Sequence, residues 1–133
     1  MVESMQVEVV SASQVVWSGE SSNIIAKTID GEIGILAGHS PLLAVLEPSA
    51  VVIITEDGSR EIVAVDGGFI SVSQGRVSIL SEYARMAGEV SVAQAERELA
   101  EAQTALDSGD ATDDDRQTFQ RATAQLRAAQ KAQ

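Results

Sequence analysis

The sequence predicts a mainly β protein with an α-helical end, in which an N-terminal antiparallel β-sandwich or flattened barrel precedes a C-terminal antiparallel helical hairpin. In the first part, short runs of alternating apolar and polar residues are separated by turn signals, a pattern typical of antiparallel sheets. In the last part, apolar residues recur at helical spacing. The expected units are a sandwich over residues 1–84, a linker over 85–90 and a helix–turn–helix over 91–133.

Two tight turns predict β-hairpins within the sandwich. Asp57-Gly58 and Gln74-Gly75 each lie between two runs rich in β-branched residues, which is a strong hairpin signal. Asp66-Gly67-Gly68 predicts a bend or bulge between successive strands rather than a phosphate loop, because no helix follows it. The predicted hairpin arms are residues 51–54 with 62–65 and residues 69–73 with 76–80.

Cap signals predict two helices after the strands. Ser91 with Gln94, and Thr112 with Asp115, have the spacing of capping boxes, and Gly109 lies in the break between them. The apolar stripes are mostly alanine, and the few large residues are each worth roughly 1.5–3 kcal/mol when buried. Ordering the chain offsets much of that gain. The hairpin is therefore expected to dock marginally, either as a movable segment or as a static cap on the sheet. The stripes are Ala95, Leu99, Ala102 and Leu106, then Phe119, Ala122, Leu126 and Ala129.

The stretch Gly31–Leu43 predicts a strand over 33–36, an exposed turn over 37–41 and a return to the core over 42–46. The turn carries His39, the single histidine of the chain. An exposed polar residue on a rigid turn is typical of a binding loop. A lone histidine is equally compatible with an ordinary loop residue, and both interpretations stay open on the residues alone.

Composition argues against several classes of function. The formal net charge is −11, and residues 1–88 hold four basic against eleven acidic side chains, so no nucleic-acid partner is expected. One histidine and no cysteine make a zinc site improbable. The sequence contains neither a nucleophile elbow nor a GxxxxGK[ST] phosphate loop. No catalytic residues, metal or cofactor are therefore expected, and an enzyme is the weakest of the hypotheses.

Several blocks in order resemble one family, the epsilon subunit of bacterial F-type ATP synthase. The resemblance covers nearly the whole chain, and each block alone is weak. Its most recognisable run is Asp30–Leu36 followed by Gly38-His39-Ser40-Pro41-Leu42-Leu43. The other blocks are Val15–Glu20, Gly67-Gly68-Phe69, Val77–Leu80 and Ala124–Arg127.

The resemblance implies a non-catalytic rotor subunit of the central stalk, whose sandwich binds the gamma subunit and the c-ring. It implies a helix pair that either folds on the sandwich or extends into the alpha/beta catalytic hexamer and inhibits ATP hydrolysis. By residue match, Glu32 and His39 would face the c-ring, and Arg116, Arg121 and Arg127 would meet acidic surfaces of the hexamer. The implied location is the cell membrane, peripheral on its cytoplasmic side, without direct insertion.

The sequence departs from the family pattern at two places. Ala37 replaces the usual proline before the glycine–histidine pair. Some members bind ATP through an [IL]-D-x-x-R-A motif, whose aspartate and arginine positions are Ser91 and Gln94 here. Because an arginine is a natural phosphate partner, we expect no nucleotide binding. The alternative function is a stand-alone β-sandwich module that binds a small ligand.

Overall fold

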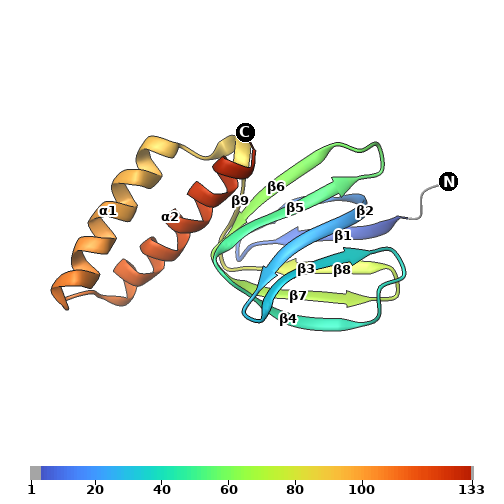
Figure 1. Cartoon of the computed structure of the whole chain (residues 1–133), viewed down its shortest axis with the longest axis horizontal. Coiled ribbons are helices and arrows are strands. Elements are labelled where there is room, and N and C mark those ends of the chain that lie inside the picture. The colour runs from blue at the N-terminus through green and yellow to red at the C-terminus, as the bar shows by residue number, and fades with distance from the viewer. Residues whose placement is uncertain (1–3, 133) are drawn as a thin grey trace.

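The computed structural model describes residues 4–132, so residues 1–3 of the expected sandwich and residue 133 of the expected helical unit lie outside it. Figure 1 shows a β-sandwich with two helices packed against one side. The strands are β1 (Met5–Val10), β2 (Val15–Thr28), β3 (Gly31–Leu36), β4 (Leu42–Leu46), β5 (Ser49–Thr55), β6 (Arg60–Val65), β7 (Gly68–Ser73), β8 (Arg76–Leu80) and β9 (Ala84–Met86). A 3₁₀ turn, η1 (Ala87–Glu89), leads to α1 (Val92–Ser108) and α2 (Asp113–Lys131).

The strands form one sheet folded into two layers, in the order β1-β8-β7-β4-β2-β5-β6-β9 with β3 paired to β2. The 14-residue strand β2 pairs with β1 near its start and with β3 and β5 further along, so it belongs to both layers. All pairings are antiparallel except β1 with β8. The predicted sandwich is therefore confirmed, with one parallel pair that alternation alone does not reveal.

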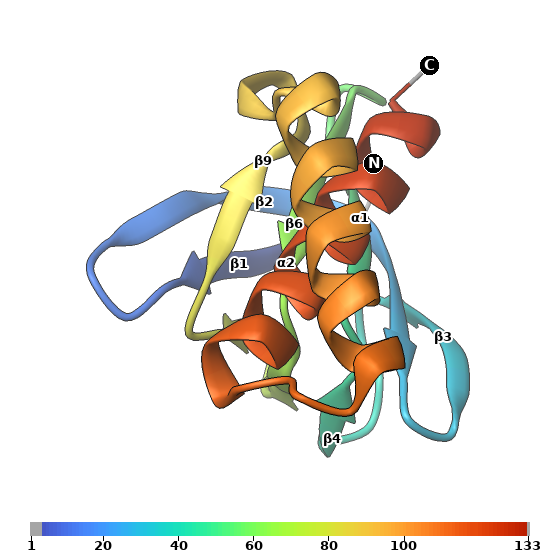
Figure 2. The same ribbon diagram turned by 90° about the vertical axis from the view of Figure 1, so that its left-hand side faces the viewer.

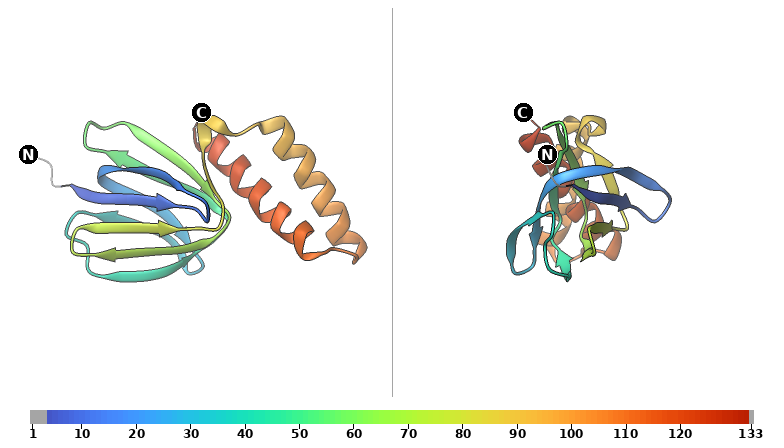
Figure 3. Two further views of the ribbon diagram at one scale, coloured as in Figure 1. Left: turned by 180° about the vertical axis from the view of Figure 1, so that it is seen from behind. Right: turned by 90° about the vertical axis from the view of Figure 1, so that its right-hand side faces the viewer.

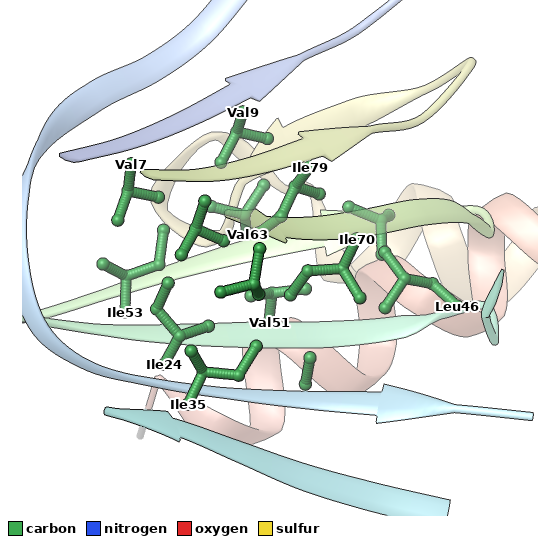
Figure 4. Packing of buried hydrophobic residues seen from close by; sticks show 14 of the residues in the cluster. Val7, Val9, Ile24, Ile35, Leu46, Val51, Ile53, Val63, Ile70 and Ile79 are labelled. Carbon is green, nitrogen blue, oxygen red and sulfur yellow. The ribbon is translucent and has the colours of Figure 1, made fainter. Parts of the chain in front are cut away.

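The core lies between the two layers and is built from aliphatic side chains. Successive residues of a strand point to opposite faces, so every second residue enters the core. In β1, Val7 and Val9 are fully buried while Gln6 and Glu8 are exposed. Figure 4 shows these side chains meeting Ile24, Ile35, Ile53, Val63, Ile70 and Ile79 from the other strands.

The predicted turns are confirmed. Asp57-Gly58 joins β5 to β6, and Gln74-Gly75 joins β7 to β8 with both residues at positive φ. The bend at Asp66-Gly67-Gly68 brings the chain from one layer to the other. Gly68 has φ +104°, and a Cβ there would lie 2.0 Å from the carbonyl oxygen of Leu80, so only glycine fits without displacing the backbone.

Both helices begin, and α1 ends, where the cap signals predict. Ser91 accepts a hydrogen bond from the Gln94 backbone, but the Gln94 side chain turns to Glu98, so the first capping box is only half formed. The Thr112–Asp115 box is complete, and Gly109 ends α1 in the left-handed conformation. The segment predicted as a linker, residues 85–90, begins within a strand, because residues 84–86 form β9 and extend the sheet beside β6.

The hairpin docks through α2, and α1 packs on the side of α2 that faces away from the sandwich (Figures 1 and 3). Ala124 and Ala128 of α2 are buried against the outer face of β5 and β6. Because alanine has a short side chain, the helix axis lies close to the sheet but little apolar area is buried per residue. The residues of this second cluster on the sheet are Ala50, Val52, Ile62 and Ala64.

Candidate functional site

Glu32 and His39 lie at opposite ends of the same edge strand, β3. Glu32 is its second residue and stands opposite Lys27 of β2, whereas His39 follows three residues after its last. Glu32, Gly34 and Leu36 alternate on the exposed face of β3. Seen from the helix side in Figure 2, β3 lies beside the two helices and is not covered by them. The two predicted contact residues are therefore joined by one exposed strand and do not form a compact pair.

His39 is held in a defined orientation by its own turn. Its backbone N–H donates to the Leu36 carbonyl at 3.0 Å, and Nδ1 lies 2.7 Å from the carbonyl oxygen of Ser40. A carbonyl only accepts, so Nδ1 carries the proton and Nε2 of the neutral ring is left as an acceptor. Ala37, which replaces the family's proline, is partly buried and packs against the core, so the turn is also held at its start.

An apolar row crosses the outer face of the layer formed by β1, β8, β7 and β4. Val45 pairs with Phe69, Phe69 pairs with Leu80, and Leu80 pairs with Val10 on four neighbouring strands. Phe69 and Leu80 are each about half exposed, at 49% and 48%. An exposed aromatic residue within a contiguous apolar patch is typical of a protein-binding surface. Sequence reasoning missed this row, although alternation in residues 69–73 already places Phe69 on the face opposite the core.

Arg121 joins the hairpin to the sandwich. Its Nε donates to Oδ2 of Asp66 at 3.1 Å, and its guanidinium lies 5.1 Å from the centre of the Tyr83 ring. The Asp66 side chain is only 7% exposed and also accepts hydrogen bonds from Ser81 Oγ and the Tyr83 backbone. One turn further along α2, Gln125 hydrogen-bonds the Tyr83 hydroxyl. The carboxylate thus has three donors, one of which comes from the hairpin.

The other two candidate arginines are placed differently. Arg127 donates from Nη1 to the carbonyl oxygen of Pro48 at 2.6 Å, which fixes the last turns of α2 to the sandwich. Arg116 pairs with Asp113 of its own helix at 3.1 Å, on the surface. Of the three, Arg121 and Arg127 therefore hold the docked hairpin, and Arg116 contributes only within α2.

The positions that match the ATP motif line a polar cavity of about 560 Å³ between the helices and the end of β9. Ser91 and Gln94 lie there together with two arginines and three glutamates. Arg121 already pairs with Asp66, so the carboxylates outweigh the remaining guanidinium, and an anionic ligand is disfavoured. The charged side chains of the lining are Arg85, Glu89, Glu98, Glu101 and Arg121.

Two further observations concern metal binding and membrane-spanning helices. Across residues 4–132, no three side chains of His, Cys, Asp or Glu come together in a way that could hold a metal ion. Neither helix of that range is long and apolar enough to span a bilayer.

Known proteins resemble this chain over most of its length. Residues 4–87 match the family model described as "ATP synthase, Delta/Epsilon chain, beta-sandwich domain". The ATP synthase epsilon chain of Cutibacterium acnes is 45% identical over 127 residues, covering 95% of this chain and 87% of that protein. The epsilon chain of Streptomyces avermitilis is 46% identical over 112 residues, covering 84% and 88%.

A likeness in structure accompanies the likeness in sequence. A chain from the mitochondrial ATP synthase of Euglena gracilis, solved as an OSCP/F1/c-ring assembly, superposes with a TM-score of 0.76 at 22% identity. The match covers 97% of this chain and 81% of that one, so the shared fold includes the helical part. By family model and sequence identity, with a fold that agrees, the chain belongs to the ATP synthase epsilon chains, which are non-catalytic subunits.

Proposed function

We propose that the sandwich of this chain couples the gamma subunit to the c-ring and that the helical hairpin regulates ATP hydrolysis by leaving the sandwich. The regulatory part of the proposal rests on the contacts that Arg121 and Arg127 make with the sandwich. Of the three side chains that the family resemblance assigns to the extended hairpin, two bind the sandwich in the docked hairpin, Arg121 at Asp66 and Arg127 at Pro48.

The Arg121 guanidinium cannot pair with Asp66 in the docked hairpin and with a carboxylate of the catalytic hexamer at the same time. When α2 leaves the sheet, Arg121 loses Asp66 and the Tyr83 ring, and an acidic surface of the catalytic hexamer would replace the lost carboxylate. The docked state is thus favoured until a partner offers a comparable anion. A segment held by a few contacts of this kind is shifted by any ligand that prefers one of its two positions.

For the c-ring, we propose the exposed face of β3 as the contact surface. Glu32 and His39 mark its ends, and in the neutral ring both present hydrogen-bond acceptors outward. Replacing both by alanine should weaken binding to isolated c-ring while changing the free energy of unfolding by less than about 0.5 kcal/mol, because both are surface residues. Glu56→Ala, in the exposed β5–β6 turn, is the matched control. A large fall in melting temperature for the double variant would assign these side chains a structural role.

For gamma, we propose the apolar row Val45–Phe69–Leu80–Val10. Phe69→Glu places a charge at the centre of the row without entering the core, and it should reduce co-purification with gamma. Ser73→Glu, on the same face of β7 but beyond the row, is the control that adds the same charge. Equal loss of gamma binding in both variants would count against the row.

Reconstitution tests the proposal as a whole. The gamma-containing F1 complex, prepared without this chain, should recover coupling to the membrane sector when the chain is added. Deleting residues 89–133 should leave that assembly intact and alter the inhibition of ATP hydrolysis. If the full chain neither joins the complex nor restores coupling, the rotor function is wrong. If the truncated chain fails to assemble, the hairpin is structural and not regulatory.

A further inference from the structure

A cavity of about 360 Å³ lies between the C-terminal end of α2 and the sandwich. The helix contributes Arg127, Gln130 and Lys131, whose spacing of three and four residues places them on one face. The sandwich contributes residues of β2, β3 and β5, among them Lys27. This cavity shares no lining residue with the one that holds Ser91 and Gln94, so it is a separate place at which the hairpin and the sandwich meet.

The charge of this cavity is opposite to that of the chain. The chain has 20 acidic and 9 basic side chains, yet the lining has three basic side chains and one acidic one, Glu32. Beside the lining, Glu47 pairs with Lys27, and Arg60 donates from Nη2 to the carbonyl oxygen of Lys131 at 3.4 Å. That contact also offsets the negative partial charge at the end of α2. With both neighbours counted, basic side chains still outnumber acidic ones, so the cavity favours an anion.

The donors of the cavity are only partly used by the chain itself. Arg127 donates from Nη1 to Pro48, and its other guanidinium nitrogens form no hydrogen bond within residues 4–132. Lys131 forms no ion pair within the same residues. The pair of Lys27 with Glu47 is long, at 3.8 Å, and both side chains are more than one-third exposed, so it contributes little and is readily exchanged.

We infer that this cavity binds a soluble phosphate dianion, which bridges Lys27 of the sandwich to Arg127 and Lys131 of the hairpin. A phosphate has several acceptor oxygens, and lysine and arginine give it short, charge-assisted hydrogen bonds. A soluble anion is favoured over a lipid headgroup, because a chain of net charge −11 is repelled from an anionic membrane.

A bound phosphate would act on the position of the hairpin. Lys27 belongs to the sandwich, and the other two cations belong to α2, so the complete set of donors exists only while the hairpin is docked. A ligand that binds one of two states raises the population of that state. The inference goes beyond the proposed function, because binding and docking are both measured on the isolated chain.

Binding is tested by titrating sodium phosphate at pH 8 into the full chain, with ionic strength held constant by sodium chloride. Backbone amide shifts at residues 27, 130 and 131 should saturate with a dissociation constant of about 1 mM. Lys27→Gln and Lys131→Gln should each weaken binding about tenfold, because each removes a charge-assisted hydrogen bond. Arg76→Gln on β8 and Arg116→Gln on α2 remove the same charge outside the cavity and should bind like the wild type.

Bridging is tested by hydrogen exchange of α2. At about 10 mM phosphate, the amides of α2 should exchange about tenfold more slowly than in chloride of equal ionic strength, because release of the hairpin then competes with bound ligand. Unchanged exchange despite saturable binding would overturn the bridge. Urea unfolding of each variant checks that the sandwich is intact.

Three other outcomes would overturn the site itself. They are shifts that chloride alone reproduces, equal affinity of the Lys27 and Lys131 variants, and binding to phosphatidylglycerol vesicles without a response to soluble phosphate. The last of these would assign the cations to lipid. None of these results decides whether the chain joins the gamma-containing complex, so the proposed function is tested separately by reconstitution.

Discussion

The Arg121 side chain reaches from α2 to Asp66, with 3.1 Å between Nε and Oδ2, and Asp66 lies three residues before Phe69 of the apolar row. The contact that holds the hairpin and the surface proposed for gamma therefore come from the two ends of one short bend. Gly68, within that bend, packs against the backbone of Leu80 and leaves it little freedom to move.

Asp66→Asn should loosen the hairpin without unfolding the sandwich. The amide oxygen can still accept from Ser81 and Tyr83, but the charge that Arg121 binds is lost. Removing one partner of a buried pair costs about 3–5 kcal/mol, and we expect about 1–2 kcal/mol here because Arg121 is one-third exposed. Hydrogen exchange should accelerate in α1 and α2 relative to β5. Arg116→Gln, which breaks an exposed pair, should leave exchange unchanged, and equal exchange in Asp66→Asn would contradict the role of this contact.

Mg-ATP should not bind the cavity lined by Ser91 and Gln94. Three glutamates line that cavity, and Arg121 is already paired, so phosphate groups would meet net negative charge. Isothermal calorimetry should detect no saturable heat at submillimolar nucleotide. The double variant Ser91→Asp with Gln94→Arg restores the motif positions and serves as the comparison. Saturable submillimolar binding by the wild-type chain would overturn this prediction.

Asp57 should make folding stability depend on pH in the acid range. The hydroxyl of Thr55, followed by the backbone and side chain of Ser59, lowers the pKa of Asp57 from 3.8 to about 2. Because the folded pKa lies below the unfolded one, the contribution is present above about pH 4 and is lost as the pH falls towards 2. Urea midpoints of the wild type should therefore fall over that window more steeply than those of Asp57→Asn. Parallel pH profiles would show that this turn does not contribute.

Gly68→Ala should be among the most destabilising single substitutions in the sandwich. Both the positive φ and the 2.0 Å approach to the Leu80 carbonyl oppose a Cβ, so we expect a loss of more than about 3 kcal/mol. Chemical denaturation measures the loss, and Gly34→Ala, with free space around its Cβ, is the control with the same chemical change. Similar midpoints for the two variants would mean that the bend relaxes.

Local signals in the sequence were sufficient for most of the elements but not for their contacts. Turn glycines and alternation predict the two hairpins, and Thr112 with Asp115 predicts the start of α2, because these depend on neighbouring residues. The strand β9 has only three residues, too few to show alternation. The parallel neighbour of β1 was also missed, since alternation tells which face is buried but not which strand lies beside it.

For the candidate site, too, the sequence was enough to name residues but not to find their partners. Glu32, His39 and the arginines could be named from the sequence, because they lie in recognisable runs. The partner of Arg121 could not, because Asp66 is 55 residues away and meets it only through the docking angle of α2. Family membership makes the stand-alone binding module and the enzyme unnecessary as explanations of this chain.

The alanines between α2 and the sheet have a thermodynamic consequence for the hairpin. A contact built from methyl groups hides little apolar surface, so its release changes the heat capacity only slightly. The enthalpy of releasing the hairpin should then be nearly constant with temperature, so a van't Hoff plot of the docked–released equilibrium should be close to linear, unlike that of sandwich unfolding.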